Sequence, residues 1–379
     1  MSSLSQSISG FSLELFKTLE KDAKTSNVSY SPFSIATALS MVLLGARGET
    51  AAQMEKVLSI DKMDNVPVKF KALISAINKP GADYILRTAN ALYGEKEFPF
   101  LEEFLKLAQE YFQANLKSVD FSAKSEESRK EINDWVEQKT EGKIKDLLSA
   151  GSVNSLTRLV ILNAIYFKGN WANKFDPEHT HERPFRLSKN ESKPVQMMYK
   201  KAKFPMNYAD DVLANVISLP YVNSELSMII ILPDDIEDGT TGLEKLERNL
   251  THEKFAEWTD PTKMHQTEVE VSLPKFKLEC SYDLKGLLCK MGMTDVFDQS
   301  KADLSGISGT NNLVLSKVAH KCYVDVNEEG TEAAGSTAAV IMLRCIRFTP
   351  KFTCDHPFLF FIVHKESNSI LFCGKFCSP

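Results

Sequence analysis

Residues 328–344 have the sequence Glu-Glu-Gly-Thr-Glu-Ala-Ala-Gly-Ser-Thr-Ala-Ala-Val-Ile-Met-Leu-Arg, in which most side chains are small. In a strand, alternate side chains face opposite sides of a sheet. The alternate set from Thr331 to Ile341 carries no charge, whereas the other set carries only Glu332. This alternation predicts a segment that can join a sheet as an extra strand, although a flexible surface loop can have the same composition.

The residues upstream of this segment have a strand pattern. Residues 313–326 are largely apolar, with Cys322, Val324 and Val326 in alternation. Apolar or alternating runs predict further strands over 159–167, 228–232 and 267–273, and a C-terminal hairpin over 358–363 and 370–376. A segment that can remain outside such a sheet or join it would be a bistable element.

Helical periodicity occupies the first third of the chain. Apolar residues three and four positions apart predict helices over 4–19, 101–111 and 132–142, the last of them ending near Gly142 because glycine suits a helix C-terminus. No linker, charge block or repeat separates these helices from the strands of the last third. We therefore expect one α+β domain over residues 1–379.

The composition is that of a globular protein and gives no sign of nucleic-acid or membrane binding. Of the 379 residues, 43% are hydrophobic and 25% are charged, as in an ordinary globular protein. The net charge of −5 favours neither a nucleic acid nor a membrane as partner.

Features of the chain also indicate its compartment. The first residues lack the basic and apolar stretches of a secretory signal. The seven cysteines form an odd set between Cys280 and Cys377, which favours free thiols in a reducing compartment. We expect a cytoplasmic protein, with release to the extracellular space as the alternative. The sequons at Asn27, Asn190 and Asn249 would be used only after secretion.

Sequence motifs of enzyme chemistry are absent. The chain contains no Walker loop and no GxGxxG, HExxH or GxSxG motif. Cys373 and Cys377 lack the spacing and nearby histidines of a zinc site, so two thiols on a terminal strand are favoured. The acidic residues 234–238 lack EF-hand spacing, which favours a solvated loop over a calcium site. We expect no metal, no cofactor and no enzyme, although a Cys–His hydrolase built from scattered residues stays open.

Several segments together resemble one protein family, the serpins, and the resemblance covers the whole chain. The segment Glu328-Glu329-Gly330-Thr331-Glu332-Ala333-Ala334 resembles the hinge of inhibitory serpins. The other matching segments are Ser31-Pro-Phe-Ser-Ile35, Gly45-Ala-Arg-Gly-Glu-Thr50, Trp135-Val136 with Thr140-Glu-Gly-Lys-Ile144, Asn163-Ala-Ile-Tyr-Phe-Lys-Gly-Asn-Trp171 and Asp355-His-Pro-Phe-Leu-Phe-Phe361. The C-terminal residues Cys377-Ser-Pro379, together with the missing secretory signal, resemble the serpins of clade B, the ovalbumin-type branch.

This resemblance implies the serpin fold and the serpin mechanism. Helices would pack on large, mainly antiparallel sheets, with an exposed reactive-centre loop over about residues 328–350. In this family the scissile bond follows the residue fourteen positions after the hinge glycine, which here is Arg344. The bond Arg344–Cys345 therefore suits a trypsin-like serine protease, and Met342 and Leu343 are secondary candidates for chymotrypsin-like proteases.

The implied reaction is suicide inhibition. The protease serine attacks the Arg344 carbonyl and forms an acyl ester. The cleaved loop then inserts into the sheet and carries the tethered protease away before water completes hydrolysis. The expected partner is thus a trypsin-like serine protease, joined covalently to a monomer of this chain.

The resemblance also implies two groups of residues that hold the sheet closed. The shutter comprises Ser31, Ser34, Asn163 and His320, whose polar side chains would bridge the strands that must part. Alternatively, His320 is an ordinary buried histidine with satisfied hydrogen bonds. The breach comprises Lys275 and Glu328 at the base of the loop, and an exposed ion pair of this kind stabilises a protein by about 0–1 kcal/mol.

The main alternative is a non-inhibitory serpin that acts as a binding, storage or chaperone protein. Members of that kind tend to place bulky or charged residues in the hinge. The small residues from Thr331 to Ser336 argue against it, apart from Glu332. An arginine at the reactive bond suits many proteases of the trypsin class.

Overall fold

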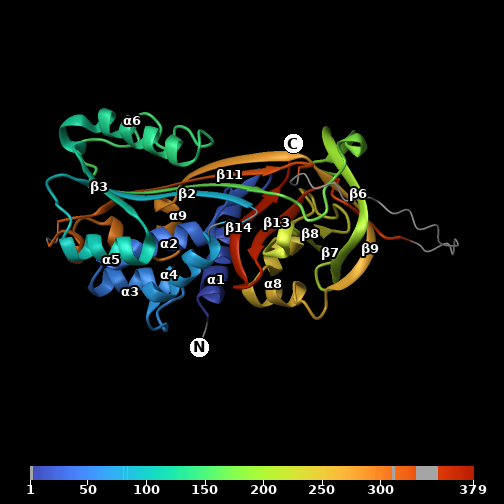
Figure 1. Ribbon diagram of the computed structural model, residues 1–379, viewed down its shortest axis with the longest axis horizontal. Coiled ribbons are helices and arrows are strands. Elements are labelled where there is room, and N and C mark those ends of the chain that lie inside the picture. The colour runs from blue at the N-terminus through green and yellow to red at the C-terminus, as the bar shows by residue number, and fades with distance from the viewer. Residues whose placement is uncertain (1–2, 80, 83, 310–311, 330–348) are drawn as a thin grey trace.

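A five-stranded sheet runs along the long axis of the molecule (Figure 1). The structure is a computed structural model that describes residues 3–79, 81–82, 84–309, 312–329 and 349–379. The strand order is β10 (Phe276–Asp283), β11 (Leu315–Val326), β4 (Leu159–Gly169), β2 (Tyr84–Glu95) and β3 (Asn115–Val119). Adjacent strands are antiparallel in β10–β11 and β4–β2, whereas β11 and β4 run parallel.

Strand β4 is buried on both faces, as its apolar run predicts. Leu159, Ile161, Ile165 and Phe167 belong to the larger core, which lies under the helices of the first third. The intervening residues Val160, Leu162 and Ala164 belong to a smaller core that includes residues of helix α6 (Phe121–Lys139). Alternate side chains of one strand thus serve two hydrophobic layers, because successive residues point to opposite faces.

Helices cover both faces of this sheet. Figure 1 shows α6 on one side of β2 and β11, and α2, α4 and α5 on the other side. The bounds of the first five helices are α1 (Leu4–Glu20), α2 (Pro32–Leu43), α3 (Gly48–Val57), α4 (Val66–Ile77) and α5 (Glu102–Phe112). Those of the later helices are α7 (Glu244–Asn249), α8 (His252–Trp258), α9 (Lys285–Lys290) and α10 (Ser305–Ser308), with 3₁₀ turns at η1 (Pro177–His179), η2 (Val222–Ser224) and η3 (Asp295–Phe297).

The predicted helices over 4–19 and 101–111 are confirmed by α1 and α5. The third predicted helix is present as α6, which begins already at Phe121 and ends at Lys139, near Gly142. Gly142 lies beyond that end with φ +74°, and its N–H donates to the carbonyl of Glu137 at 2.8 Å. This glycine therefore closes the turn that follows the helix, in the left-handed conformation that glycine adopts without strain.

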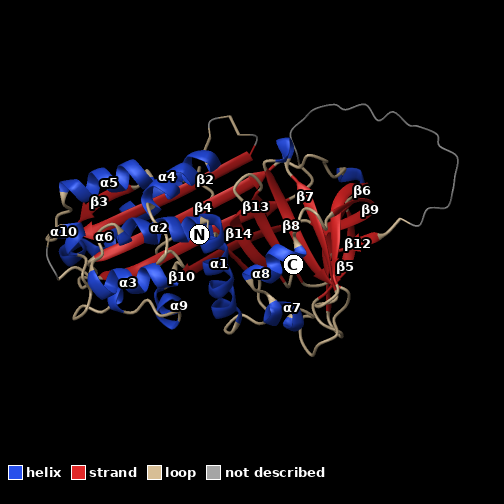
Figure 2. Cartoon of the chain, turned by 90° about the horizontal axis from the view of Figure 1, so that it is seen from below, coloured by secondary structure: helices blue, strands red, loops and turns tan. Residues whose placement is uncertain are grey.

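A nine-stranded sheet forms the other part of the molecule (Figure 2). Eight of its strands follow one another in the order β1 (Val28–Tyr30), β14 (Ser369–Phe376), β13 (Phe358–His364), β8 (Leu226–Pro233), β7 (Ala214–Pro220), β6 (Ser192–Ala209), β9 (His265–Pro274) and β12 (Lys351–Thr353), while β5 (His181–Arg186) pairs with β6. The predicted C-terminal hairpin is confirmed by the antiparallel pair β13–β14. The predicted strand over 267–273 is confirmed by β9, whose alternating residues Val269, Val271 and Leu273 are fully buried.

The fold class is therefore α+β, with helices on large, mainly antiparallel sheets, as expected. The parallel pairs are β11–β4, β2–β3 and β12–β9. Among the described residues, every helix is too short or too polar to cross a bilayer. Strand β11 ends at Val326, and β12 begins at Lys351, so both border the segment that the sequence predicts as the reactive-centre loop.

Candidate functional site

The predicted loop residues fall largely outside the described part of the chain. Of the hinge, the structure describes Glu328 and Glu329. The remaining predicted positions lie outside the described residues: Gly330, Thr331, Glu332, Ala333, Ala334, Met342, Leu343, Arg344 and Cys345. The shutter and the breach are both described. The shutter residues His320 and Asn163 lie across the boundary between β11 and β4, and the breach lies beyond the end of β11, where β10 begins.

The centre of the shutter is a side-chain contact across the parallel strand pair. His320 on β11 and Asn163 on β4 are direct partners in the ladder. The ring nitrogen Nδ1 of His320 lies 2.5 Å from Oδ1 of Asn163, and Nε2 accepts a hydrogen bond from the backbone N–H of Ser31 at 3.2 Å. Because Nε2 is the acceptor, Nδ1 carries the proton and donates it to Asn163.

Burial keeps this histidine neutral. His320 is fully buried, and burial lowers its pKa to about 3. The neutral ring can therefore accept from Ser31 and donate to Asn163 at the same time. The interpretation of His320 as a buried histidine with satisfied hydrogen bonds holds, and its partners are also the predicted shutter residues.

The amide nitrogen of Asn163 extends the shutter to a third strand and to α2. It donates to the carbonyl of Ser34 at 3.1 Å, lies 2.5 Å from Oδ1 of Asn90 on β2, and contacts the Ser34 hydroxyl. Asn90 and Asn163 are direct partners in the β2–β4 ladder. Side chains of the shutter thus connect β11, β4 and β2 in one row, with Asn90 as a member that sequence reasoning missed.

Ser31 takes part differently from the expectation. Its side chain does not bridge the strands but accepts from the Ser34 N–H at 3.2 Å, which caps the N-terminus of α2. Serine is favoured at this position because its oxygen satisfies one of the free N–H groups of the first turn. The backbone of Ser31, and not its hydroxyl, contacts His320.

The breach joins the end of β11 to the turn between β9 and β10. Nζ of Lys275 lies 2.9 Å from Oε2 of Glu328, and the Thr180 hydroxyl donates to Oε1 at 2.9 Å. Burial by itself raises the pKa of Glu328, but the hydrogen bonds from Lys275, from its own backbone and from Thr180 lower it below the usual value. Glu328 is 8% exposed, so this carboxylate needs its partners more than a surface group would.

Two further contacts at the same end tie β11 to β4, and sequence reasoning missed both. Nζ of Lys168 on β4 lies 2.6 Å from Oε2 of Glu329. The indole N–H of Trp171 donates to the carbonyl of Asn327 at 2.8 Å, while its ring stacks on Tyr221 with centroids 4.5 Å apart. Lys168 and Trp171 lie in the serpin-like segment 163–171, so the family resemblance pointed to this segment. The sequence alone did not reveal that the two residues contact Glu329 and Asn327.

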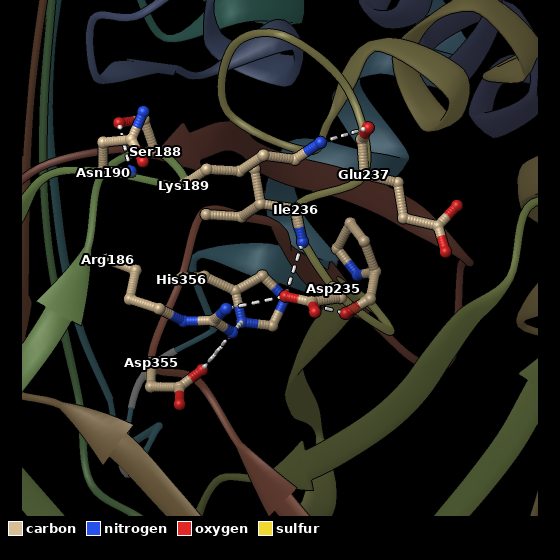
Figure 3. A network of polar contacts seen from close by, with 10 residues as sticks. Arg186, Ser188, Lys189, Asn190, Asp235, Ile236, Glu237, Asp355 and His356 are labelled. Carbon is tan, nitrogen blue, oxygen red and sulfur yellow. Dashed lines mark hydrogen bonds and ion pairs between the residues drawn. The ribbon is translucent and has the colours of Figure 1, made fainter.

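The segment that follows β12 is held by a cluster of charged residues (Figure 3). The Arg186 guanidinium lies between Asp235, at 2.6 Å, and Asp355, at 3.4 Å. Nε2 of the buried His356 lies 2.8 Å from the carbonyl of Pro233 at the end of β8. The serpin-like residues from Asp355 onward thus fasten the chain where it leaves β12 and enters the core strand β13.

The acidic residues 234–238 make local contacts within the fold. Asp234 accepts from the Tyr208 hydroxyl at 2.6 Å. The Asp238 carboxylate accepts backbone N–H groups of Thr240, Gly242 and Glu244 around the start of α7, at 2.8–3.1 Å. Within the described ranges, no group of three or more His, Cys, Asp or Glu side chains is arranged to hold a metal ion.

Comparisons with known proteins agree with this architecture. The family model described as "Serpin (serine protease inhibitor)" matches residues 6–379. Serpin B6 of Macaca fascicularis is 53% identical over 382 residues, and the leukocyte elastase inhibitor of Equus caballus is 52% identical over 379 residues; each alignment covers 100% of both chains.

The structure of uncleaved ovalbumin matches with a TM-score of 0.92 and 36% identity over 100% of both chains. A maspin structure matches with a TM-score of 0.93 and 37% identity over 99% of this chain and 98% of that one. Together with the shutter, the breach and the β11–β4 boundary, these matches mean that the chain belongs to the serpin family, in its clade B.

Proposed function

We propose that this chain is a suicide-substrate inhibitor of trypsin-like serine proteases and that Arg344–Cys345 is its reactive bond. The observation that carries the proposal is the parallel pairing of β11 with β4, directly beside the point where the predicted loop leaves the sheet. A chain that turns back after β11 runs antiparallel to β11, and therefore antiparallel to β4 as well. One inserted strand would replace a parallel ladder with two antiparallel ladders, and antiparallel pairing is slightly more stable per residue.

Insertion also requires that the present contacts across the boundary break. The strand would have to pass between Glu329 and Lys168 first, and between His320 and Asn163 deeper in the sheet. The alternate set from Thr331 to Ile341 supports this step, because it brings no charge into the sheet. Cleavage would free the strand to insert, and the gain in pairing and buried apolar area would drive inhibition.

The residue before the scissile bond supports the choice of protease. Arg344 fits the S1 pocket of a trypsin-like protease, which carries an acidic residue, whereas the S1 pocket of an elastase is small. The chain is thus proposed to differ in target from the relatives named leukocyte elastase inhibitor. Met342 and Leu343 remain the secondary positions for chymotrypsin-like proteases. We propose further that the chain acts in the cytoplasm as a monomer, in a one-to-one complex.

A panel of trypsin, chymotrypsin and elastase tests this proposal on denaturing gels. Trypsin is expected to give an SDS-stable one-to-one complex and to release a peptide that begins at Cys345. Arg344→Ala should abolish this complex, while Arg347→Ala, which removes another basic residue of the same segment, should retain it. A released peptide that begins elsewhere refutes the reactive bond. Proteolysis without any covalent complex, with all three proteases, supports a non-inhibitory serpin instead.

A further inference from the structure

Two cysteines face each other at the edge of the five-stranded sheet. Cys280 on β10 and Cys322 on β11 are direct partners in the antiparallel ladder, so their side chains point to the same face. Residues opposed in this way have Cα atoms about 4.5–5.5 Å apart, within the range of about 4.4–6.8 Å that a disulfide spans. Both are free thiols in this structure.

We propose that Cys280 and Cys322 form a reversible cross-strand disulfide when the protein meets a low-molecular-weight disulfide such as oxidised glutathione. The pair differs from the other described cysteines. Cys373 on β14 is opposed to Tyr30 on one side and to Phe361 on the other, and Cys289 lies on α9 away from any ladder. Among the described cysteines, Cys280 and Cys322 are the pair that a strand ladder places directly opposite each other.

Exposure sets the order of the two thiols. Strand β10 is the edge strand of its sheet, and Cys280 is partly exposed there, whereas Cys322 is fully buried. Cys280 therefore meets the oxidant first and Cys322 resolves the adduct. Burial raises the pKa of both thiols, so few thiolates exist in the closed structure, and we expect the exchange to be slow.

The exchange balances as two successive displacements. The Cys280 thiolate attacks one sulfur of oxidised glutathione, which forms a mixed disulfide and releases one glutathione thiolate. The Cys322 thiolate then attacks the Cys280 sulfur, which forms the intramolecular disulfide and releases the second glutathione thiolate. The two protons of the protein thiols pass to the two glutathione molecules, so the protein dithiol is oxidised by two electrons and the glutathione disulfide is reduced.

The disulfide would change the contacts of β1, which lies beside this pair. In the reduced protein the Cys322 thiol donates to the carbonyl of Ser29 at 2.9 Å, and the Ser29 N–H donates to the Tyr282 hydroxyl at 3.3 Å. Oxidation removes the thiol donor but fastens β10 covalently to β11. Because the new bond lies one strand away from the β11–β4 boundary, it should hold the sheet edge together without blocking insertion of a strand at that boundary.

The test uses a Cys345→Ser variant, which removes the cysteine that lies outside the described residues. We expect incubation with oxidised glutathione, alkylation of the remaining thiols and digestion without reductant to give a linked peptide pair that contains Cys280 and Cys322. The intact protein should lose two hydrogen atoms in mass, dithiothreitol should reverse the change, and amide exchange in β10 should slow in the oxidised form.

Single substitutions in the same background give matched controls. Cys289→Ser removes another partly exposed thiol and should leave the link unchanged, whereas Cys322→Ser should leave a glutathione adduct on Cys280. The proposal is overturned if Cys280 retains glutathione while Cys322 stays alkylatable. It is equally overturned if the link joins another pair, or if neither thiol reacts under conditions that modify Cys289.

Discussion

Lowering the pH should weaken the shutter through protonation of one buried histidine, His320. Its pKa is lowered by burial to about 3, whereas an unperturbed histidine in the unfolded chain titrates near about 6.5. The unfolded chain therefore binds more protons than the folded protein between these two values, and stability rises with pH in that window. The contribution of neutral His320 is complete above about pH 6.5 and is lost progressively as the pH falls toward about 3.

The magnitude follows from the width of this window. Each pH unit between the two pKa values costs about 1.4 kcal/mol of unfolding free energy. At about pH 5 the loss is therefore about 2 kcal/mol, a large share of the roughly 5–15 kcal/mol that stabilises a typical folded protein. Protonation of Nε2 would also remove the acceptor for the Ser31 N–H, so the folded protein cannot avoid the cost by charging the ring in place.

Urea unfolding midpoints, measured between about pH 5 and 7.5, check this prediction. The wild-type midpoint should fall more steeply with decreasing pH than that of His320→Asn, which keeps a polar side chain but does not titrate. Removal of an exposed histidine, as in His265→Gln, should leave the wild-type slope unchanged. Equal slopes for the wild type and His320→Asn would show that His320 is not held neutral by the fold.

Three further predictions concern the loop and its base. Thr331→Arg should convert the inhibitor into a substrate, because an unpaired charge would enter the sheet first; an unchanged stoichiometry of inhibition contradicts this. Lys275→Ala and Lys168→Ala should each speed the loss of inhibitory activity on warming, because they free Glu328 and Glu329. Lys168→Ala should lower the free energy of unfolding by only about 0–1 kcal/mol, since Glu329 is exposed, whereas Lys275→Ala should lower it more, since it leaves the buried Glu328 carboxylate without its cation; unchanged inactivation rates argue against a closing role. Cleavage within the loop should raise the melting temperature clearly, since insertion adds a strand, and equal melting of the cut and uncut protein speaks against insertion.

Elements with a clear period could be predicted from the sequence alone. The buried apolar residues of α1 recur every three or four positions, which is typical of a helix, and those of β9 alternate, which is typical of a strand. Strand β6 was missed although it is 18 residues long, because Pro194, Pro205 and several lysines interrupt its pattern. Pairing with β9, β5 and β7 stabilises this strand, and such long-range pairing leaves little trace in local sequence.

The site could be predicted only in part, for a related reason. Family resemblance identified His320 and Asn163, which are 157 positions apart in the sequence. Asn90 reaches the shutter only through the register of β2 on β4, and Lys168 reaches Glu329 only because β4 and β11 end side by side. Register is a property of the assembled sheet, so residues that meet through it could not be paired from one sequence.

Strand insertion can be observed in the structure of the chain after a single cut in the loop. We expect residues from Thr331 onward to form a new strand between β11 and β4, antiparallel to both. His320 and Asn163 would then no longer be partners in one ladder, although they are in the uncut protein. A cut protein in which β11 still pairs with β4 in the present register would contradict inhibition by strand insertion.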